Sequence, residues 1–68
     1  MSMEIVVNGA PRTVEEDCTV ERLLTALELN RPGVAVAVDR KVVPRSHHAT
    51  TALSPGARVE VIRAVGGG

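Results

Sequence analysis

One stretch of this sequence has the periodicity of an amphipathic helix, and it constrains the fold more than any other feature. Its apolar residues recur at i, i+3, i+4 and i+7: Val20, Leu23, Leu24 and Leu27. Thr19 precedes them as a good N-cap, and Pro32 prevents the helix from continuing. We predict a helix over about residues 20–28, ended by a left-handed residue at Asn30. A helix this short needs a partner for its leucines, so we expect it to pack on a sheet.

The rest of the chain is typical of short strands joined by turns. The predicted strands cover residues 3–7, 10–14, 34–38, 41–43 and 58–63. Asn8-Gly9 is a strong signal for a two-residue hairpin, because both residue types tolerate a positive φ. Pro11 lacks an N–H, which places the second strand at the rim of the sheet. The apolar run 34–38 favours a central position, and the last strand is expected to lie beside the first.

The segment 45–57 has no strand or long helix pattern. Ser46 is a candidate cap for a single helical turn, and the following His47 and His48 are expected to be solvated. The side chains of adjacent residues point apart, and no second cluster of ligand residues would complete a tetrahedral metal site. We therefore predict no metal site at His47 and His48. Leu53 is expected to fill part of the core.

These elements predict an α+β fold in which one main helix covers one face of a mixed sheet of four to five strands. The folded domain should span residues 1–65, followed by a flexible tail over residues 66–68. Apolar residues make up 44% of the chain, which suits a globular protein. The absence of Phe, Tyr and Trp leaves neither an aromatic platform for nucleic-acid bases nor the makings of a deep pocket.

Charge and cysteine content argue against several classes of function. Eight Lys and Arg balance eight Asp and Glu without a block of one sign, so we expect no nucleic-acid partner. No apolar run approaches the roughly 20 residues of a membrane helix. A single cysteine, Cys18, cannot form an intrachain disulfide, which favours a reducing compartment and a cytoplasmic location. A small buried hydrophobe is favoured for Cys18 over a reactive thiol, and no group of residues resembles a catalytic site.

The sequence ends in Gly66-Gly67-Gly68 after an apolar strand. Three residues without side chains make a thin chain that can enter a narrow channel of a partner, which would make the carboxylate of Gly68 the reactive group. A frayed terminus explains the same glycines equally well on spacing alone.

An apolar surface is predicted just before these glycines. If Val59 and Val61 face the helix, then Ile62 must face outward, with Ala64 and Val65 continuing the surface towards the end of the sequence. Such a cluster is interpreted as a partner-docking patch, with incidental exposure as the alternative.

With these features in place, the whole chain resembles the ThiS family, the ubiquitin-like β-grasp sulfur carriers of thiamine biosynthesis. The resemblance rests on the Asn8-Gly9 hairpin, the Thr19-Val20 helix entry with Leu23-Leu24, the strand 34–38, the run Val42-Val43-Pro44-Arg45-Ser46 and the ending Val65-Gly66-Gly67-Gly68. The sequence departs from the family at three positions. Asp39 stands where the family often has Asn, and His48 stands where an aromatic residue is common. Ala64 stands where a larger apolar residue is often found.

The resemblance implies a carrier and not an enzyme. A ThiF-type adenylating enzyme would use ATP and Mg²⁺ to adenylate Gly68, and sulfur from a cysteine desulfurase system would convert the terminus to a thiocarboxylate. The thiocarboxylate would then donate sulfur to a ThiG-type thiazole synthase. The carrier would bind no cofactor itself and would be a monomer when free. Related alternatives are a sulfur carrier for molybdopterin or cysteine synthesis and a ubiquitin-like protein modifier.

Overall fold

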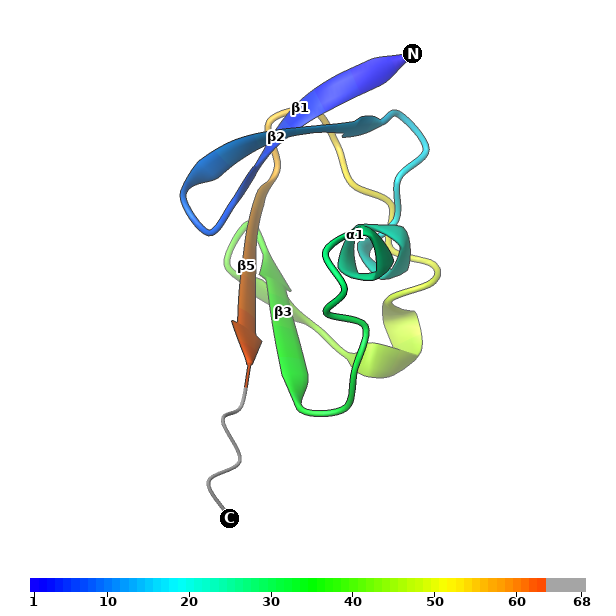
Figure 1. Ribbon diagram of the computed structural model, residues 1–68, viewed down its shortest axis with the longest axis vertical. Helices are drawn as coiled ribbons and strands as arrows, with labels where there is room; N and C mark the ends of the chain where they lie inside the picture. The colour runs from blue at the N-terminus through cyan, green and yellow to red at the C-terminus, as the bar shows by residue number, and fades with distance from the viewer. Residues whose placement is uncertain (64–68) are drawn as a thin grey trace.

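The computed structural model describes residues 1–63, and Figure 1 shows how their helix and strands are arranged. The strands are β1 (Ser2–Val7), β2 (Ala10–Glu15), β3 (Val34–Val38), β4 (Lys41–Val43) and β5 (Arg58–Arg63). The α-helix is α1 (Val20–Ala26), and a short 3₁₀ turn, η1 (Arg45–His47), follows β4. Residues 64–68, which include the predicted tail, lie outside the described residues.

The five strands form one mixed sheet in the order β2-β1-β5-β3-β4. β5 pairs parallel with β1 and antiparallel with β3, so the last strand lies beside the first as predicted. Pro11 belongs to β2, which is an edge strand, and this agrees with its missing N–H. The apolar β3 is an interior strand, although β5 and not β3 is the middle one. The predicted α+β class, with one helix on a mixed sheet, is confirmed.

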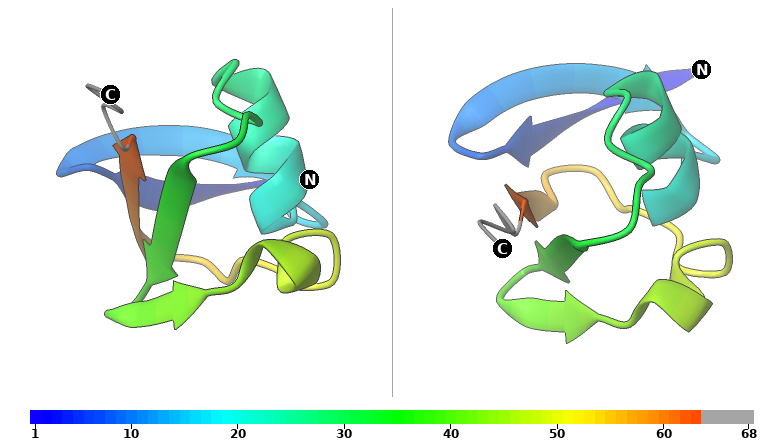
Figure 2. Two further views of the ribbon diagram at one scale, coloured as in Figure 1. Left: turned by 90° about the horizontal axis from the view of Figure 1, so that it is seen from below. Right: turned by 60° about the horizontal axis from the view of Figure 1, so that its bottom comes forward.

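The core lies between the sheet and α1. Figure 2 shows that α1 and the segment carrying η1 lie on the same side of β3 and β5. The most deeply buried side chains come from both layers: Ile5, Val20, Leu23, Leu24, Val36 and Val59. Leu53 is also buried, so its predicted place in the core is confirmed. A small core made of aliphatic side chains therefore joins the helix to one face of the sheet only.

The helix begins as the sequence predicts and ends earlier. The Thr19 hydroxyl accepts a hydrogen bond from the Arg22 N–H at 3.2 Å, which confirms the N-cap. The helix ends at Ala26, and the left-handed residue is Glu28 (φ 59°), so the prediction of Asn30 was wrong.

Backbone hydrogen bonds explain the earlier end of α1. The N–H groups of Glu28 and Leu29 donate to the carbonyls of Thr25 and Leu24, at 3.1 and 2.8 Å respectively. This is the pattern of a Schellman motif, which turns Leu29 back onto the core. The gain from packing Leu29 offsets the cost of a positive φ at a residue other than glycine.

The 3₁₀ turn corrects two predictions about the segment after β4. The turn starts at Arg45, directly after Pro44, and its cap uses no side chain, so the proposed role of Ser46 was wrong. His47 is exposed as expected, but His48 is buried, and its Nε2 lies 3.1 Å from the Val43 carbonyl oxygen. A carbonyl only accepts, so this nitrogen carries the proton.

The backbone around His48 also ties the loop to the helix. The His48 carbonyl accepts a hydrogen bond from the Glu21 N–H, and the Thr51 carbonyl accepts one from the Val20 N–H, both at 3.0 Å. Two N–H groups that the first turn of α1 cannot pair internally are thereby satisfied. Burial of His48 follows from this docking, which a reading based on loop composition could not anticipate.

Candidate functional site

β5 is the strand that leads towards the predicted reactive residues. Gly66, Gly67 and Gly68 lie outside the described residues, as do Ala64 and Val65 of the predicted docking patch. The structure therefore describes the strand before them, which ends at Arg63. Because β5 is flanked by β1 and β3, it is held on both sides by backbone pairing.

Side chains of β5 alternate between a covered and an open face of the sheet. Val59 and Val61 are buried against the helix layer, at 1% and 8% exposure. Ile62 points the other way and is 60% exposed, as predicted. Its β-branched side chain suits a strand, and a single exposed apolar residue is ordinary, so the residues around Ile62 decide whether it belongs to a larger surface.

Neighbouring strands extend the apolar surface around Ile62. Ala35 of β3 is paired directly with Ile62, and Ala37 is paired directly with Val42 of β4. Directly paired residues share a face, and Val42 is 76% exposed. Ala35, Ala37, Val42 and Ile62 are called the open-face patch below. The exposed Glu60 of β5 pairs with Ala37 and therefore lies on the same face, at the edge of this patch.

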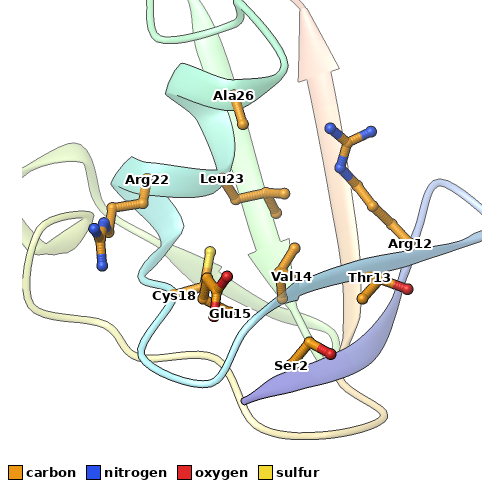
Figure 3. Close-up of a pocket in the computed structure, with 9 residues that line it drawn as sticks. All are labelled: Ser2, Arg12, Thr13, Val14, Glu15, Cys18, Arg22, Leu23 and Ala26. Atoms are coloured by element: carbon orange, nitrogen blue, oxygen red, sulfur yellow. The ribbon is translucent and has the colours of Figure 1, made fainter.

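A cavity of about 310 Å³ lies between β2 and α1. Figure 3 shows Val14, Cys18 and Leu23 around it, and the Arg22 side chain forms an ion pair with Asp17 at 3.1 Å. The lining combines apolar side chains with polar ones, among them Arg12 and Glu15, and no set of these side chains matches a particular ligand. We therefore assign no ligand to this cavity.

Cys18 is the one thiol of the chain, and it behaves as a packing residue. Its side chain is buried, and Sγ donates to the Thr19 carbonyl at 3.4 Å. Burial raises the pKa of the thiol above its ordinary value of 9.0, and the charge of Arg22 opposes this only in part. The nucleophilic thiolate is therefore disfavoured near neutral pH, which supports the prediction of a buried hydrophobe.

Within residues 1–63, no group of three or more His, Cys, Asp and Glu side chains is placed to hold a metal ion. In the same part of the chain, no helix has the length and apolar character needed to span a membrane.

A five-stranded sheet with β5 at its centre, grasping a single helix, defines a ubiquitin-like β-grasp protein. The comparisons with known proteins agree: the model of the ThiS family matches residues 5–68. The chain belongs to the ThiS family. The match extends over Gly66, Gly67 and Gly68 as well as the end of β1 and all of β2 to β5.

Two solved structures share this fold and sequence. A crystal structure of thiamine biosynthesis protein ThiS from Geobacter metallireducens is 35% identical, with a TM-score of 0.82, and the match covers 97% of this chain and all of that one. A solution NMR structure of a thiamine biosynthesis protein from the same organism is also 35% identical, with a TM-score of 0.78, over 97% of this chain and 88% of the other.

Two curated relatives differ in length. A thiazole synthase from Paramagnetospirillum magneticum is 36% identical over 66 residues, which are 97% of this chain. The chain spans only 20% of that protein's length. The uncharacterized protein ycf40 from Porphyra purpurea is 28% identical over 67 residues, covering 98% of this chain and 94% of its own length.

Proposed function

We propose that this protein is a sulfur carrier for thiazole formation in thiamine biosynthesis, and that it acts as a protein cosubstrate and not as an enzyme. The observation that carries the proposal is the family match over residues 5–68, which includes the glycines after β5. The two similar structures described as thiamine biosynthesis proteins support the same pathway.

The reactive group in this proposal is the carboxylate of Gly68. A carboxylate is a poor acyl donor because oxide is a poor leaving group. A ThiF-type enzyme with ATP and Mg²⁺ would join a carboxylate oxygen of Gly68 to the α-phosphorus of ATP, releasing pyrophosphate. A persulfide formed through a cysteine desulfurase would then attack the acyl carbon with its terminal sulfur, and AMP would leave with the carboxylate oxygen. A thiol would next cleave the S–S bond of the resulting acyl disulfide, forming a disulfide with the inner sulfur. The product is a thiocarboxylate on Gly68.

A thiazole synthase is the proposed acceptor of that sulfur. The curated relative described as thiazole synthase contains, within one polypeptide, a stretch that is 36% identical to nearly all of this chain. Joining a carrier-like stretch to a synthase in one protein is most useful if the two act together. We therefore propose a ThiG-type synthase as the partner, with both proteins in the cytoplasm and the free carrier a monomer.

The open-face patch is the proposed contact with the activating enzyme. Ile62 lies on the strand that leads to the glycines, and Val42 and Ala35 extend its apolar surface. An interface there would hold β5 close to the active site that receives Gly68. Ala64 and Val65 are proposed to continue the contact beyond the described residues.

A reconstitution with a ThiF-type enzyme, a ThiG-type synthase, ATP, Mg²⁺ and a desulfurase system tests this function. The full chain should support thiazole formation, and the variant lacking Gly67 and Gly68 should abolish it while keeping the unfolding curve of the parent protein. Thiazole formation by the shortened variant would contradict the role of Gly68. Activity only with enzymes of molybdopterin or cysteine synthesis, or accumulation of isopeptide adducts, would contradict the thiamine pathway.

A further inference from the structure

Asn8 stands where β1 turns away from the central strand. It has φ 50°, and Gly9 has φ 83°, so the two residues form the tight turn into β2. Up to this point β1 follows β5: the Val6 N–H donates to the Ala57 carbonyl, and the Asn8 N–H donates to the Val59 carbonyl, both at 2.9 Å. The next donor in this series would be the N–H of Ala10, but the turn places Ala10 in β2.

After the backbone of β1 has turned away from β5, the side chain of Asn8 still forms hydrogen bonds with β5. Its Oδ1 accepts a hydrogen bond from the Val61 N–H at 2.9 Å, and its Nδ2 donates to the Val61 carbonyl at 3.3 Å. The two residues are 53 positions apart in the chain. The carboxamide thus acts as a substitute peptide group and pairs with both polar backbone atoms of Val61.

Within the described residues, this pair forms the last hydrogen bonds of β5 on its β1 side. On the other side, β3 continues to pair as far as Val34 and Arg63. Val61 precedes Ile62 of the open-face patch, and Arg63 is the final residue of the strand. The end of β5 is therefore held by β3 as far as Arg63 and by the Asn8 carboxamide as far as Val61.

We propose that Asn8 is a positioning residue for activation of Gly68, which rests on the function proposed above. By holding Val61 in register, it fixes the path along which the following residues enter the activating enzyme. Only asparagine or a similarly short amide offers one donor and one acceptor in a single plane at this distance. Aspartate would keep the acceptor for the Val61 N–H and would direct a second oxygen at the Val61 carbonyl.

Asn8→Gly is the sharpest variant, because glycine tolerates the positive φ and removes only the carboxamide. Asn8→Asp keeps the size of the side chain and loses the donor. Ile5→Val is the matched control: it removes one methylene from the buried face of β1 and leaves the carboxamide in place. Folded fractions of all three are measured by circular dichroism at the assay temperature.

Two measurements follow for each variant. Hydrogen exchange at the Val61 amide should become about fivefold faster in Asn8→Gly, the equivalent of one net hydrogen bond. The Val6 amide, which is bonded to Ala57, is the internal reference and should not change. In adenylation by the ThiF-type enzyme, followed by pyrophosphate release, kcat should fall about tenfold with little change in KM, because docking is kept and positioning is lost.

The outcomes separate this inference from the function itself. If the parent protein is never adenylated, the proposed function fails. If the parent protein is adenylated and Asn8→Gly matches it in kcat, or if Ile5→Val slows the reaction as much, the positioning role is wrong. Should Asn8→Gly fold incompletely, Asn8→Asp decides: the inference requires a lowered kcat with near-normal exchange protection at Val61, and an unchanged kcat overturns it.

Discussion

The two faces of the sheet use similar residues for different purposes. Val59 and Val61 of β5 are buried under α1, whereas Ile62 of the same strand is 60% exposed beside Ala35. All three are β-branched and suit a strand equally well. What separates them is the helix, which covers one face and leaves the other free. Apolar character on the covered face is explained by folding, and on the open face it is the basis of the contact proposed above with an activating enzyme.

Leu24→Ala should have the largest effect on stability, since Leu24 is a buried residue of α1 in the core between the helix and the covered face of the sheet. The leucine is 1% exposed, and its truncation should lower the free energy of unfolding by about 2–5 kcal/mol, a large share for a small domain. Urea unfolding at 25 °C measures it. The neighbouring Thr25→Ala, on the exposed side of α1, should stay within about 0.5 kcal/mol of the parent protein.

Ile62→Asp should affect binding more than stability. A charge in the open-face patch should weaken binding to the ThiF-type enzyme by at least about tenfold, as expected for a desolvated contact. The loss of stability should stay below about 1 kcal/mol, the range of strand propensity. Calorimetric titration gives the dissociation constant, and Ile62→Thr separates lost apolar contact from added charge. An unchanged dissociation constant for Ile62→Asp would make the patch incidental.

Glycine substitutions at two nearby positions at the end of α1 should change the free energy of unfolding in opposite directions. Glu28 has φ 59°, so Glu28→Gly should raise the free energy of unfolding by roughly 0.5–1 kcal/mol through relief of the left-handed strain. Thr25 lies inside the helix, where Thr25→Gly should lower the free energy of unfolding by roughly 0.3–0.5 kcal/mol. Thermal unfolding would show the contrast. A loss for both variants would contradict the Schellman closure described above.

A smaller effect on stability should appear at high pH, where the buried thiol of Cys18 begins to ionise. The native thiol pKa is raised above 9.0, so the stability from the protonated thiol is complete below pH 9.0 and is lost as the pH rises through the native pKa. Stability should therefore fall less steeply above pH 9.0 in Cys18→Ala than in the parent protein. Parallel pH profiles would show that burial of the thiol has no linkage to folding.

Local sequence patterns predicted the helix, its N-cap, the first hairpin and the edge strand. The leucine spacing of α1, the Thr19 cap, the Asn8-Gly9 turn and the edge position of Pro11 each depend on neighbouring residues, and the structure confirms them. The outward direction of Ile62 followed from the alternation of β5. Burial of His48 and the left-handed Glu28 depend on docking between distant segments, which no local pattern encodes. The Asn8–Val61 contact joins residues 53 positions apart, and it could have been found only from the pairing of β1 with β5.

The central claim is that sulfur is carried on Gly68. Its most direct test is the intact mass of the full chain after incubation with the ThiF-type enzyme, ATP, Mg²⁺ and the desulfurase system. We expect the mass change of a sulfur-for-oxygen exchange, located on Gly68 by fragmentation and retained in Cys18→Ala. An unchanged mass despite pyrophosphate release, or added sulfur that disappears in Cys18→Ala, would contradict the account.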